Sequence, residues 1–312
     1  MKTSGKQEKS GKLVICPTPL GNLGDMPPRA LEALREADVV YCEDTRVTGK
    51  LLAALGIKGV RLERMDEATI RMPINRISMT DGPLPTDDYV TCGAALVSRA
   101  LFGETIVYCS DAGMPGVSDP GQLLVAHARE LDVPVDVLPG PTAATTAYVA
   151  SGFTCPRFYF GGFFPRKAGE RTKVLESLRP LDAVAIFYES PKRLVACLEA
   201  IADALPLRTV AVCRELSKLH EEVVIDFAPA LAERFAAREA GEGIKGEIVV
   251  VIDVADEYEL SEAKNNALDR AAQAAQKMLS SGELSKKEML KKLQDEFGIS
   301  RNAAYQLVHT RT

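Results

Sequence analysis

The chain has 312 residues, of which 46% are hydrophobic and 26% are charged, and its formal net charge is −5 at pH 7. These values are typical of a globular protein of about two domains. The three histidines are scattered and the seven cysteines show no CxxC or Cys/His spacing, which argues against a zinc site and a disulfide framework. We therefore expect reduced cysteines, no metal and a cytoplasmic location.

The two ends of the chain differ from its body. Residues 1–11 are polar without the apolar core of a signal peptide, and we expect a disordered tail there and no membrane span anywhere. Residues 261–312 contain nine Lys/Arg against six Asp/Glu, a net +3, whereas the rest has 29 against 37, a net −8. A basic appendage on an acidic body hints at an anionic polymer as partner, although a solvated lysine face is the simpler alternative.

The first structured segment is an apolar strand over residues 12–16, followed by a loop rich in Gly and Pro. A helix with apolar Ala30 and Leu34 comes next, so the chain opens as a βα unit. The G-x-G-x-x-G spacing and a P-loop lysine are both absent, so nucleotide phosphates are not the predicted ligand.

A second strand over residues 39–42 ends in Glu43, Asp44, Thr45 and Arg46. Two acids and an arginine at the carboxyl edge of a strand suit an active-site rim, where a carboxylate acts as base and the arginine meets phosphate. The alternative is structural: Asp44 or Thr45 caps the next helix, and Arg46 is paired on the surface.

The pattern becomes irregular between residues 61 and 103. An excursion of this length inside a compact domain is a lid, a binding loop or a disordered insertion, and the sequence does not choose among them.

The strand over residues 105–109 leads into a loop, residues 111–121, that is punctuated by glycine and proline. Glycines allow the backbone to approach a ligand closely, while exposed N–H groups and the Asp111 carboxylate can fix its polar parts. We predict a ligand cradle here, with an ordinary βα turn as the alternative.

Further strands alternate with helical patterns, so the fold is α/β throughout. Residues 139–144, after the strand at 134–138, are small enough to leave room for a flat ligand, although tight helix packing explains them equally well. The later strands also end in polar residues, which favours a site between two sheets. They are predicted over residues 157–160, 183–188, 209–213 and 247–252.

The tail has clear helix signals. Ser285 and Glu288 match a capping box, Gly298 ends that helix, and Ser300 caps the next one. Two helices joined by a short turn, with basic residues outside, predict a helix-turn-helix-like nucleic-acid contact. The alternative is a helical appendage that packs on a partner subunit.

Five motifs in order carry a resemblance to a known family. They lie at residues 13–23, 42–46, 110–115, 138–141 and 187–190. Together they resemble the tetrapyrrole methylase family, and in particular its members that methylate ribosomal RNA. The match extends from about residue 13 to 254, and the tail resembles the C-terminal helical extension of those members.

The resemblance implies a two-domain α/β fold of the class III methyltransferases with a small C-terminal helical extension. The expected parts are residues 12–141, 142–256 and 261–312. It also implies S-adenosylmethionine as cofactor, a homodimer, and 16S rRNA or the small ribosomal subunit as partner. The implied reaction is methylation of a cytidine ribose 2′-hydroxyl in the decoding region.

The resemblance also assigns residues. Glu43, Asp44 and Arg46 would face the acceptor. A ribose hydroxyl is a poor nucleophile until its proton is accepted, so Asp44 is a hypothesis for the general base, with Asp111, water or phosphate as alternatives. The donor would be held by Pro19, Asp111, Ala112, Gly113, Val117, Thr142, Ala143, Tyr188, Gly246 and Glu247.

Two departures affect the acceptor more than the cofactor. Residues 63–67 replace a stretch that in the family contains histidine and asparagine, and an irregular insertion follows at about residues 71–92. Two alternatives therefore stay open: a methylase of a tetrapyrrole-like small molecule, and an RNA-binding protein without catalysis.

Overall fold

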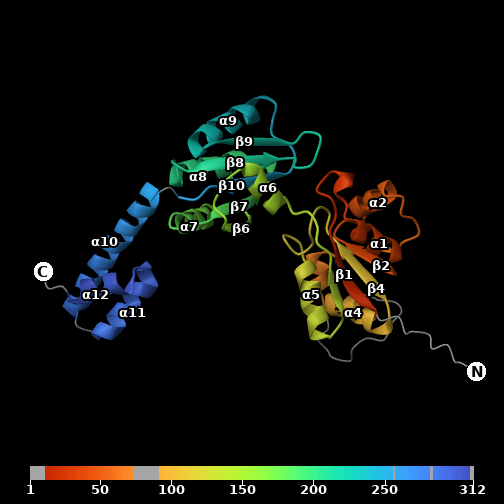
Figure 1. The fold of residues 1–312 in the computed structure, drawn as a ribbon, viewed down its shortest axis with the longest axis horizontal. Coiled ribbons are helices and arrows are strands. Elements are labelled where there is room, and N and C mark those ends of the chain that lie inside the picture. Colours follow the sequence, from red (N-terminus) through yellow and green to blue (C-terminus); the bar gives the residue numbers. More distant parts are fainter. Residues whose placement is uncertain (1–10, 74–90, 256, 282–283, 310–312) are drawn as a thin grey trace, which may run out of the picture. The chain divides into compact units, whose positions relative to one another are not determined.

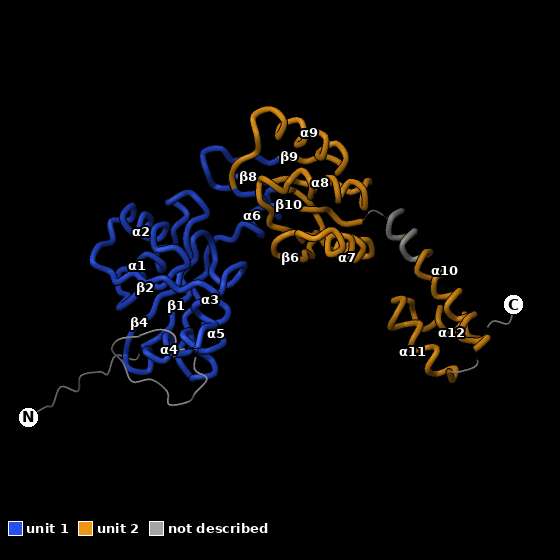
Figure 2. Tube along the Cα trace, turned by 180° about the vertical axis from the view of Figure 1, so that it is seen from behind, with its two compact units in different colours: residues 1–150, 213–223, 247–249 blue, residues 151–212, 224–246, 250–312 orange. Residues whose placement is uncertain are grey.

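The computed structural model describes residues 11–73, 91–255, 257–281 and 284–309. The expected tail over 1–11 and the expected insertion at about 71–92 therefore fall mostly outside the described residues. The chain forms two compact units (Figure 2). Unit 1 comprises residues 1–150, 213–223 and 247–249, and unit 2 comprises residues 151–212, 224–246 and 250–312.

Unit 1 contains a five-stranded sheet in the order β3-β2-β4-β1-β5, and each neighbouring pair is parallel. Parallel strands need crossover connections, which here are mostly helices. The strands are β1 (Lys12–Cys16), β2 (Val39–Cys42), β3 (Leu62–Arg64), β4 (Thr105–Cys109) and β5 (Val135–Val137).

Helices cover both faces of this sheet, as expected for apolar strands without a polar face (Figure 1). Alternate residues of the central strands point to opposite faces: Ile106 and Tyr108 pack in one core and Val107 and Cys109 in the other. The helices are α1 (Pro28–Glu36), α2 (Thr45–Ala54), α3 (Glu67–Arg71), α4 (Cys92–Ser98), α5 (Gly121–Glu130) and α6 (Ala143–Ser151), with 3-10 turns η1 (Leu23–Asp25) and η3 (Arg99–Phe102).

The second sheet has the order β6-β7-β10-β8-β9. Its strands are β6 (Phe158–Phe163), β7 (Val184–Glu189), β8 (Thr209–Arg214), β9 (Glu222–Phe227) and β10 (Ile248–Ile252). Most of the sheet belongs to unit 2, together with α7 (Ala168–Leu178), α8 (Pro191–Ala204) and α9 (Ala228–Gly241). The strands β3 and β9 were not among those predicted.

The C-terminal extension consists of α10 (Glu257–Ser281), α11 (Lys286–Phe297) and α12 (Arg301–His309). The capping box is confirmed, because Ser285 and Glu288 each accept from the other's backbone N–H. Gly298 ends α11 in the left-handed conformation, and the Ser300 hydroxyl caps α12 by accepting from the N–H of Ala303. No described helix has the length and apolar character needed to cross a membrane.

Candidate active site

The loops that carry the predicted site residues meet at one edge of the first sheet. Because all of its strand pairs are parallel, the loops after β1, β2, β3, β4 and β5 leave from the same carboxyl edge. In open α/β sheets this edge is where ligands bind.

The loop after β1 is joined to the loop after β4. The N–H of Thr18 donates to the carbonyl of Gly113 at 2.9 Å, and the N–H of Gly113 donates back to Thr18 at 3.1 Å. The buried Thr18 hydroxyl adds a bond to the carbonyl of Ser110 at 3.2 Å. These contacts fix the backbone of the predicted cradle.

Gly113 occupies a position that favours glycine for two reasons. Its φ is +81°, which side chains of L-residues rarely adopt. A Cβ there would lie 3.0 Å from Leu20 Cδ2 and 3.2 Å from the carbonyl oxygen of Pro141. Gly113 thus lies where the loops after β1, β4 and β5 come together.

The rest of the cradle is organised by Asp119. One carboxylate oxygen of Asp119 accepts from the N–H of Gly116 at 2.7 Å and from the N–H of Gly121 at 2.9 Å. The pKa of Asp119 is raised, chiefly by burial, with the charge of Asp111 adding to the effect. Val117, a predicted cofactor contact, is half-buried in this turn.

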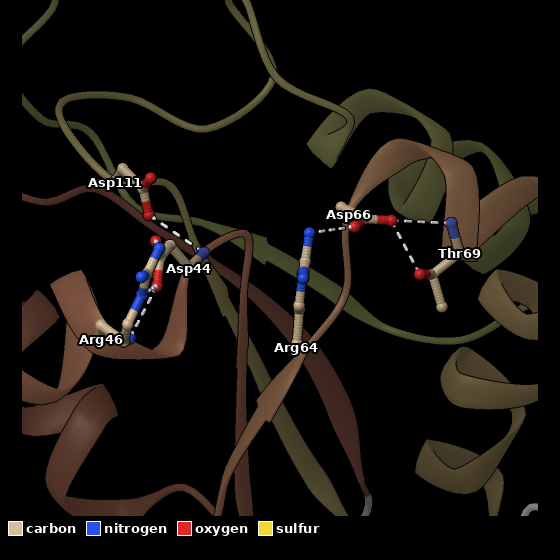
Figure 3. A network of polar contacts seen from close by, with 6 residues as sticks. All are labelled: Asp44, Arg46, Arg64, Asp66, Thr69 and Asp111. Atoms are coloured by element: carbon tan, nitrogen blue, oxygen red, sulfur yellow. Dashed lines mark hydrogen bonds and ion pairs between the residues drawn. The ribbon is translucent and has the colours of Figure 1, made fainter.

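Asp44 has the capping role that the sequence left as an alternative (Figure 3). Its carboxylate accepts from the backbone N–H of Arg46 at 2.8 Å and pairs with the Arg46 guanidinium at 2.6 Å. Its own N–H donates to Asp111 at 3.3 Å. The hydrogen bonds from Arg46 hold the pKa of Asp44 well below its usual range.

A similar group lies at the end of β3 (Figure 3). The Asp66 carboxylate accepts from the Thr69 N–H at 2.9 Å, capping α3, and pairs with Arg64 at 2.8 Å. Both arginines are nevertheless accessible: 86% of the Arg46 side chain and 68% of the Arg64 side chain is exposed. The edge therefore presents two guanidinium groups to solvent.

Glu43 differs from its neighbour Asp44. Its half-buried carboxyl has no hydrogen bond or ion pair with any residue in the described part of the chain. Burial raises its pKa to about 7, and the negative charges of Asp119, Asp111 and Asp66 contribute to the rise. Glu43 is thus a carboxyl group without a polar partner among the described residues, and it exchanges a proton near neutral pH.

Tyr108, which the sequence did not single out, is a second polar side chain without a hydrogen-bond partner among the described residues. It is fully buried near the end of β4. Burial raises its pKa, and the charges of Asp119 and Glu43 contribute. The sequence signal was a tyrosine at the penultimate position of a mainly apolar strand.

The remaining cofactor residues predicted in unit 1 lie mostly on the same edge. Pro19 is buried, Ala112 is exposed beside Asp111, and Thr142 and Ala143 are half-buried at the start of α6. The Thr142 hydroxyl accepts from the N–H of Thr145 at 3.2 Å. The edge thus carries every predicted site residue except Tyr188, Gly246 and Glu247.

Of these three residues, Tyr188 lies in unit 2 near the end of β7. Its ring packs edge-to-face on Phe160 at 4.9 Å and on Phe163 at 5.7 Å between ring centroids. Gly246, also in unit 2, has a φ of +98°. A site between the two sheets stays a prediction.

Glu247 is held by the loop after β8, one of the polar strand ends noted in the sequence. Its N–H donates to Glu215 Oε1 at 2.8 Å, and its carboxylate pairs with Lys218 at 3.1 Å. Two residues of that loop, Glu215 and Ser217, have positive φ values of 53° and 64°. A Cβ on Gly21 would lie 2.2 Å from Lys218 Cγ, so this loop also contacts the loop after β1.

The acidic side chains of this edge are also possible metal ligands by residue type. Within the described ranges, no group of three or more His, Cys, Asp or Glu residues could hold a metal ion. The carboxylates of this edge can transfer protons and accept hydrogen bonds, and two cationic side chains, Arg46 and Arg64, lie beside them.

A comparison with protein families gives one match. The family model of the Tetrapyrrole (Corrin/Porphyrin) Methylases matches residues 12–232. This range includes both the edge of the first sheet and the strands β6 to β9.

Two curated relatives have the same name, Ribosomal RNA small subunit methyltransferase I. The protein from Mycobacterium bovis is 40% identical over 245 residues, which cover 78% of this chain and 78% of the relative. The protein from Mesorhizobium japonicum is 36% identical over 297 residues, which cover 92% and 93% of the two chains.

A solved structure shows the fold at lower identity. It is the uroporphyrin-III C-methyltransferase from Thermus thermophilus in complex with S-adenosylhomocysteine. It is 17% identical, has a TM-score of 0.50, and covers 78% of this chain and 97% of its own.

Proposed function

Because this chain belongs to the tetrapyrrole methylase family, we propose that it uses S-adenosylmethionine to methylate RNA of the small ribosomal subunit. More narrowly, we propose the 2′-hydroxyl of a cytidine in the decoding region of 16S rRNA as the acceptor. The family resemblance carried by the five motifs and the predicted class III methyltransferase fold are confirmed.

One observation carries the choice of RNA over a small molecule. The relative from Mesorhizobium japonicum, which is named as a ribosomal RNA methyltransferase, aligns over 92% of this chain. The family model matches only residues 12–232, so this alignment of 297 residues also includes sequence outside the part that the family model matches. The acceptor proposed for this chain follows the name of these relatives.

The residues of unit 1 fit S-adenosylmethionine. When bound, this cofactor supplies a methyl group activated by a sulfonium cation. The carboxylates of Asp111, Asp119 and Glu43 give the edge a negative potential that suits a cation. Gly113, where a Cβ would crowd Leu20 and Pro141, lets the three loops of the cradle pack closely and so fixes its shape. Asp111, Ala112, Gly113, Val117, Pro19, Thr142 and Ala143 would hold the cofactor, with Tyr188, Gly246 and Glu247.

We assign the general base to Glu43 in preference to Asp44. The backbone N–H and the guanidinium of Arg46 both bind the Asp44 carboxylate, and the lowered pKa of Asp44 makes it a weak proton acceptor. Glu43 has no such partner among the described residues, and its pKa of about 7 suits a base that works near neutral pH. It would accept the proton of the ribose hydroxyl as the oxygen attacks the methyl carbon, and then release that proton to solvent.

The arginines of this edge suit a nucleic-acid acceptor. The exposed guanidinium groups of Arg46 and Arg64 would contact phosphate oxygens and so place the ribose near the acidic residues. Their pairing with Asp44 and Asp66 orients them without burying them. The homodimer and the cytoplasmic location remain predictions.

Methyl transfer tests the proposal directly. Labelled S-adenosylmethionine is incubated with small subunits that lack the modification, with naked 16S RNA and with a tetrapyrrole, and the methylated product is identified. We expect label in 2′-O-methylcytidine from the small subunit or its RNA. Label in the tetrapyrrole alone, or no label despite donor binding, would exclude the proposed acceptor.

A further inference from the structure

The three C-terminal helices form a small module with a core of its own. Both views show α10, α11 and α12 packed against one another (Figures 1 and 2). Their apolar sides meet in a single cluster, so the outer face of α12 is not needed for this packing. The buried residues of the cluster are Ala271, Ala275, Met289, Leu293, Ala304 and Val308.

The outer face of α12 combines an aromatic ring with basic and polar groups. Arg301, Tyr305 and His309 follow one another at intervals of four residues, which places them along one side of the helix, and all three are exposed. Tyr305 is 54% exposed, although most large apolar side chains of the module are covered. The helix contains no Asp or Glu, so nothing on α12 itself would repel an anion.

Tyr305 and His309 are arranged as a flat platform. Their rings stack with centroids 4.0 Å apart and an angle of 14° between the planes. The Nδ1–H of His309 donates to the carbonyl of Tyr305 at 3.1 Å, which fixes the orientation of the imidazole. A preordered ring loses little conformational entropy when a second planar group stacks on it.

The charge of the chain indicates which kind of partner this face fits. Residues 261–312 have a net charge of +3, whereas the remainder has −8. Exposed lysines of α11, such as Lys287 and Lys291, precede the turn into α12. An open aromatic ring beside Arg301, on a segment of net positive charge, fits a single-stranded nucleic acid, whose unpaired bases stack on aromatic side chains while its phosphates meet basic groups. The bases of a duplex are already stacked and offer no free ring face.

We propose that α12 is an RNA-binding surface, on which an unpaired base stacks against the Tyr305 and His309 pair while Arg301 contacts a phosphate. This inference rests on the proposed function in its choice of RNA, because the relatives are named for a ribosomal RNA substrate. It adds a second RNA contact, separate from the acidic edge of the first sheet.

The test measures the affinity of the full-length protein for a short single-stranded RNA of mixed sequence and for the same sequence in a duplex. We expect Tyr305→Ala to weaken single-strand binding by about 5- to 100-fold, as loss of one stacked base does. Tyr305→Phe is the matched control, because it keeps the ring and should bind as the wild type does. Arg301→Gln should reduce the slope of log affinity against log salt by about 0.7.

Circular dichroism and sedimentation of each variant check that its helix content and oligomeric state match those of the wild type. The inference is overturned if wild-type protein binds neither RNA, if it prefers the duplex, or if Tyr305→Ala binds the single strand as tightly as Tyr305→Phe does. It is also overturned if Tyr305→Ala changes the oligomeric state and not the RNA affinity, since α12 would then contact a second copy of the chain.

Methyl transfer by the wild type separates this inference from the proposed function. Transfer to the small subunit, combined with equal RNA affinity of Tyr305→Ala and Tyr305→Phe, overturns the inference alone. The opposite outcome is also distinguishable. If Tyr305→Ala but not Tyr305→Phe loses affinity for single-stranded RNA, and the wild type transfers no methyl group to the small subunit, the inference is supported and the proposed acceptor is wrong.

Discussion

Replacing Glu43 by glutamine tests the assignment of the base. Glutamine keeps the size and polarity of the side chain and removes its ability to accept a proton. We expect single-turnover methyl transfer to small subunits at pH 8 to fall by about 10² to 10⁴, the usual contribution of a general base. Donor affinity should change much less. The matched control is Asp44→Asn, which alters the adjacent carboxylate and should lower turnover by less than about ten-fold, since Asn also caps helices.

The pH dependence gives a second signature of the same carboxyl. Because the pKa of Glu43 is about 7, the base is protonated and inactive at low pH. The kcat/KM of the wild type should therefore rise as the pH increases through about 7 and then level off. The residual activity of Glu43→Gln should lack this rise.

Stability should change in the opposite direction from activity. The pKa of Glu43 is raised in the folded protein, so the unfolded chain ionises first as the pH increases from about 4.5 to 7, and stability is lost across that window. A pKa rise from 4.5 to about 7 corresponds to at most about 3 kcal/mol. Since the side chain is only half-buried, screening by solvent lowers this to about 1 to 2 kcal/mol.

Urea unfolding at two pH values measures this effect. Glu43→Gln should be more stable than the wild type by about 1 to 2 kcal/mol at pH 8 and equal to it near pH 4.5. The reasoning is refuted if Glu43→Gln retains full turnover, or if Asp44→Asn and not Glu43→Gln loses the rise of activity with pH. A stability difference that is the same at both pH values would show that Glu43 is not an acid of raised pKa.

Three further substitutions test the surroundings of the site and the extension. Gly113→Ala should destabilise the protein by about 1 to 3 kcal/mol and weaken donor binding, because the φ of Gly113 is positive and the added Cβ is crowded. In the control Gly169→Ala, the added Cβ lies in open space on α7, and this variant should melt at the temperature of the wild type or higher. Asp119→Ala should cost about 1 to 3 kcal/mol in thermal unfolding, since two N–H groups lose their acceptor. Ser285→Ala should speed hydrogen exchange in the first turn of α11, as loss of a cap costs about 1 kcal/mol, without affecting methyl transfer.

The sequence predicted the elements that short-range patterns determine. The strands β1, β2 and β4 have the predicted bounds, because each is a mainly apolar run followed by a proline or a polar residue. The caps at Ser285 and Gly298 depend on residues within one turn and were equally visible. By contrast β3 has only three residues and β9 is a partly exposed edge strand, so neither has a strong apolar period.

The surroundings of Glu43 could not be predicted in this way. Burial is the main cause of the raised pKa of Glu43, and the charges of Asp119, Asp111 and Asp66 add to it. These aspartates follow two different strands, and they lie near Glu43 because the sheet order places β2 between β3 and β4. The order of parallel strands is a tertiary property that a single sequence does not reveal. Each acid could be assigned to a strand end, but their mutual influence could not.

Glu43 and Asp44 illustrate how adjacent residues acquire different chemistry. The partners of Asp44 are local: it caps α2 and pairs with a residue two positions away, which keeps it ionised. The pKa of Glu43 is raised to about 7 chiefly by burial, and the negative charges of Asp119, Asp111 and Asp66, which come from distant segments, add to the rise. A carboxylate that accepts hydrogen bonds from its own helix stabilises the folded protein but stays ionised. A half-buried carboxylate without such partners destabilises the folded protein when ionised, and it can exchange a proton near neutral pH. The cost in stability above pH 7 and the proposed role as base therefore have the same physical origin.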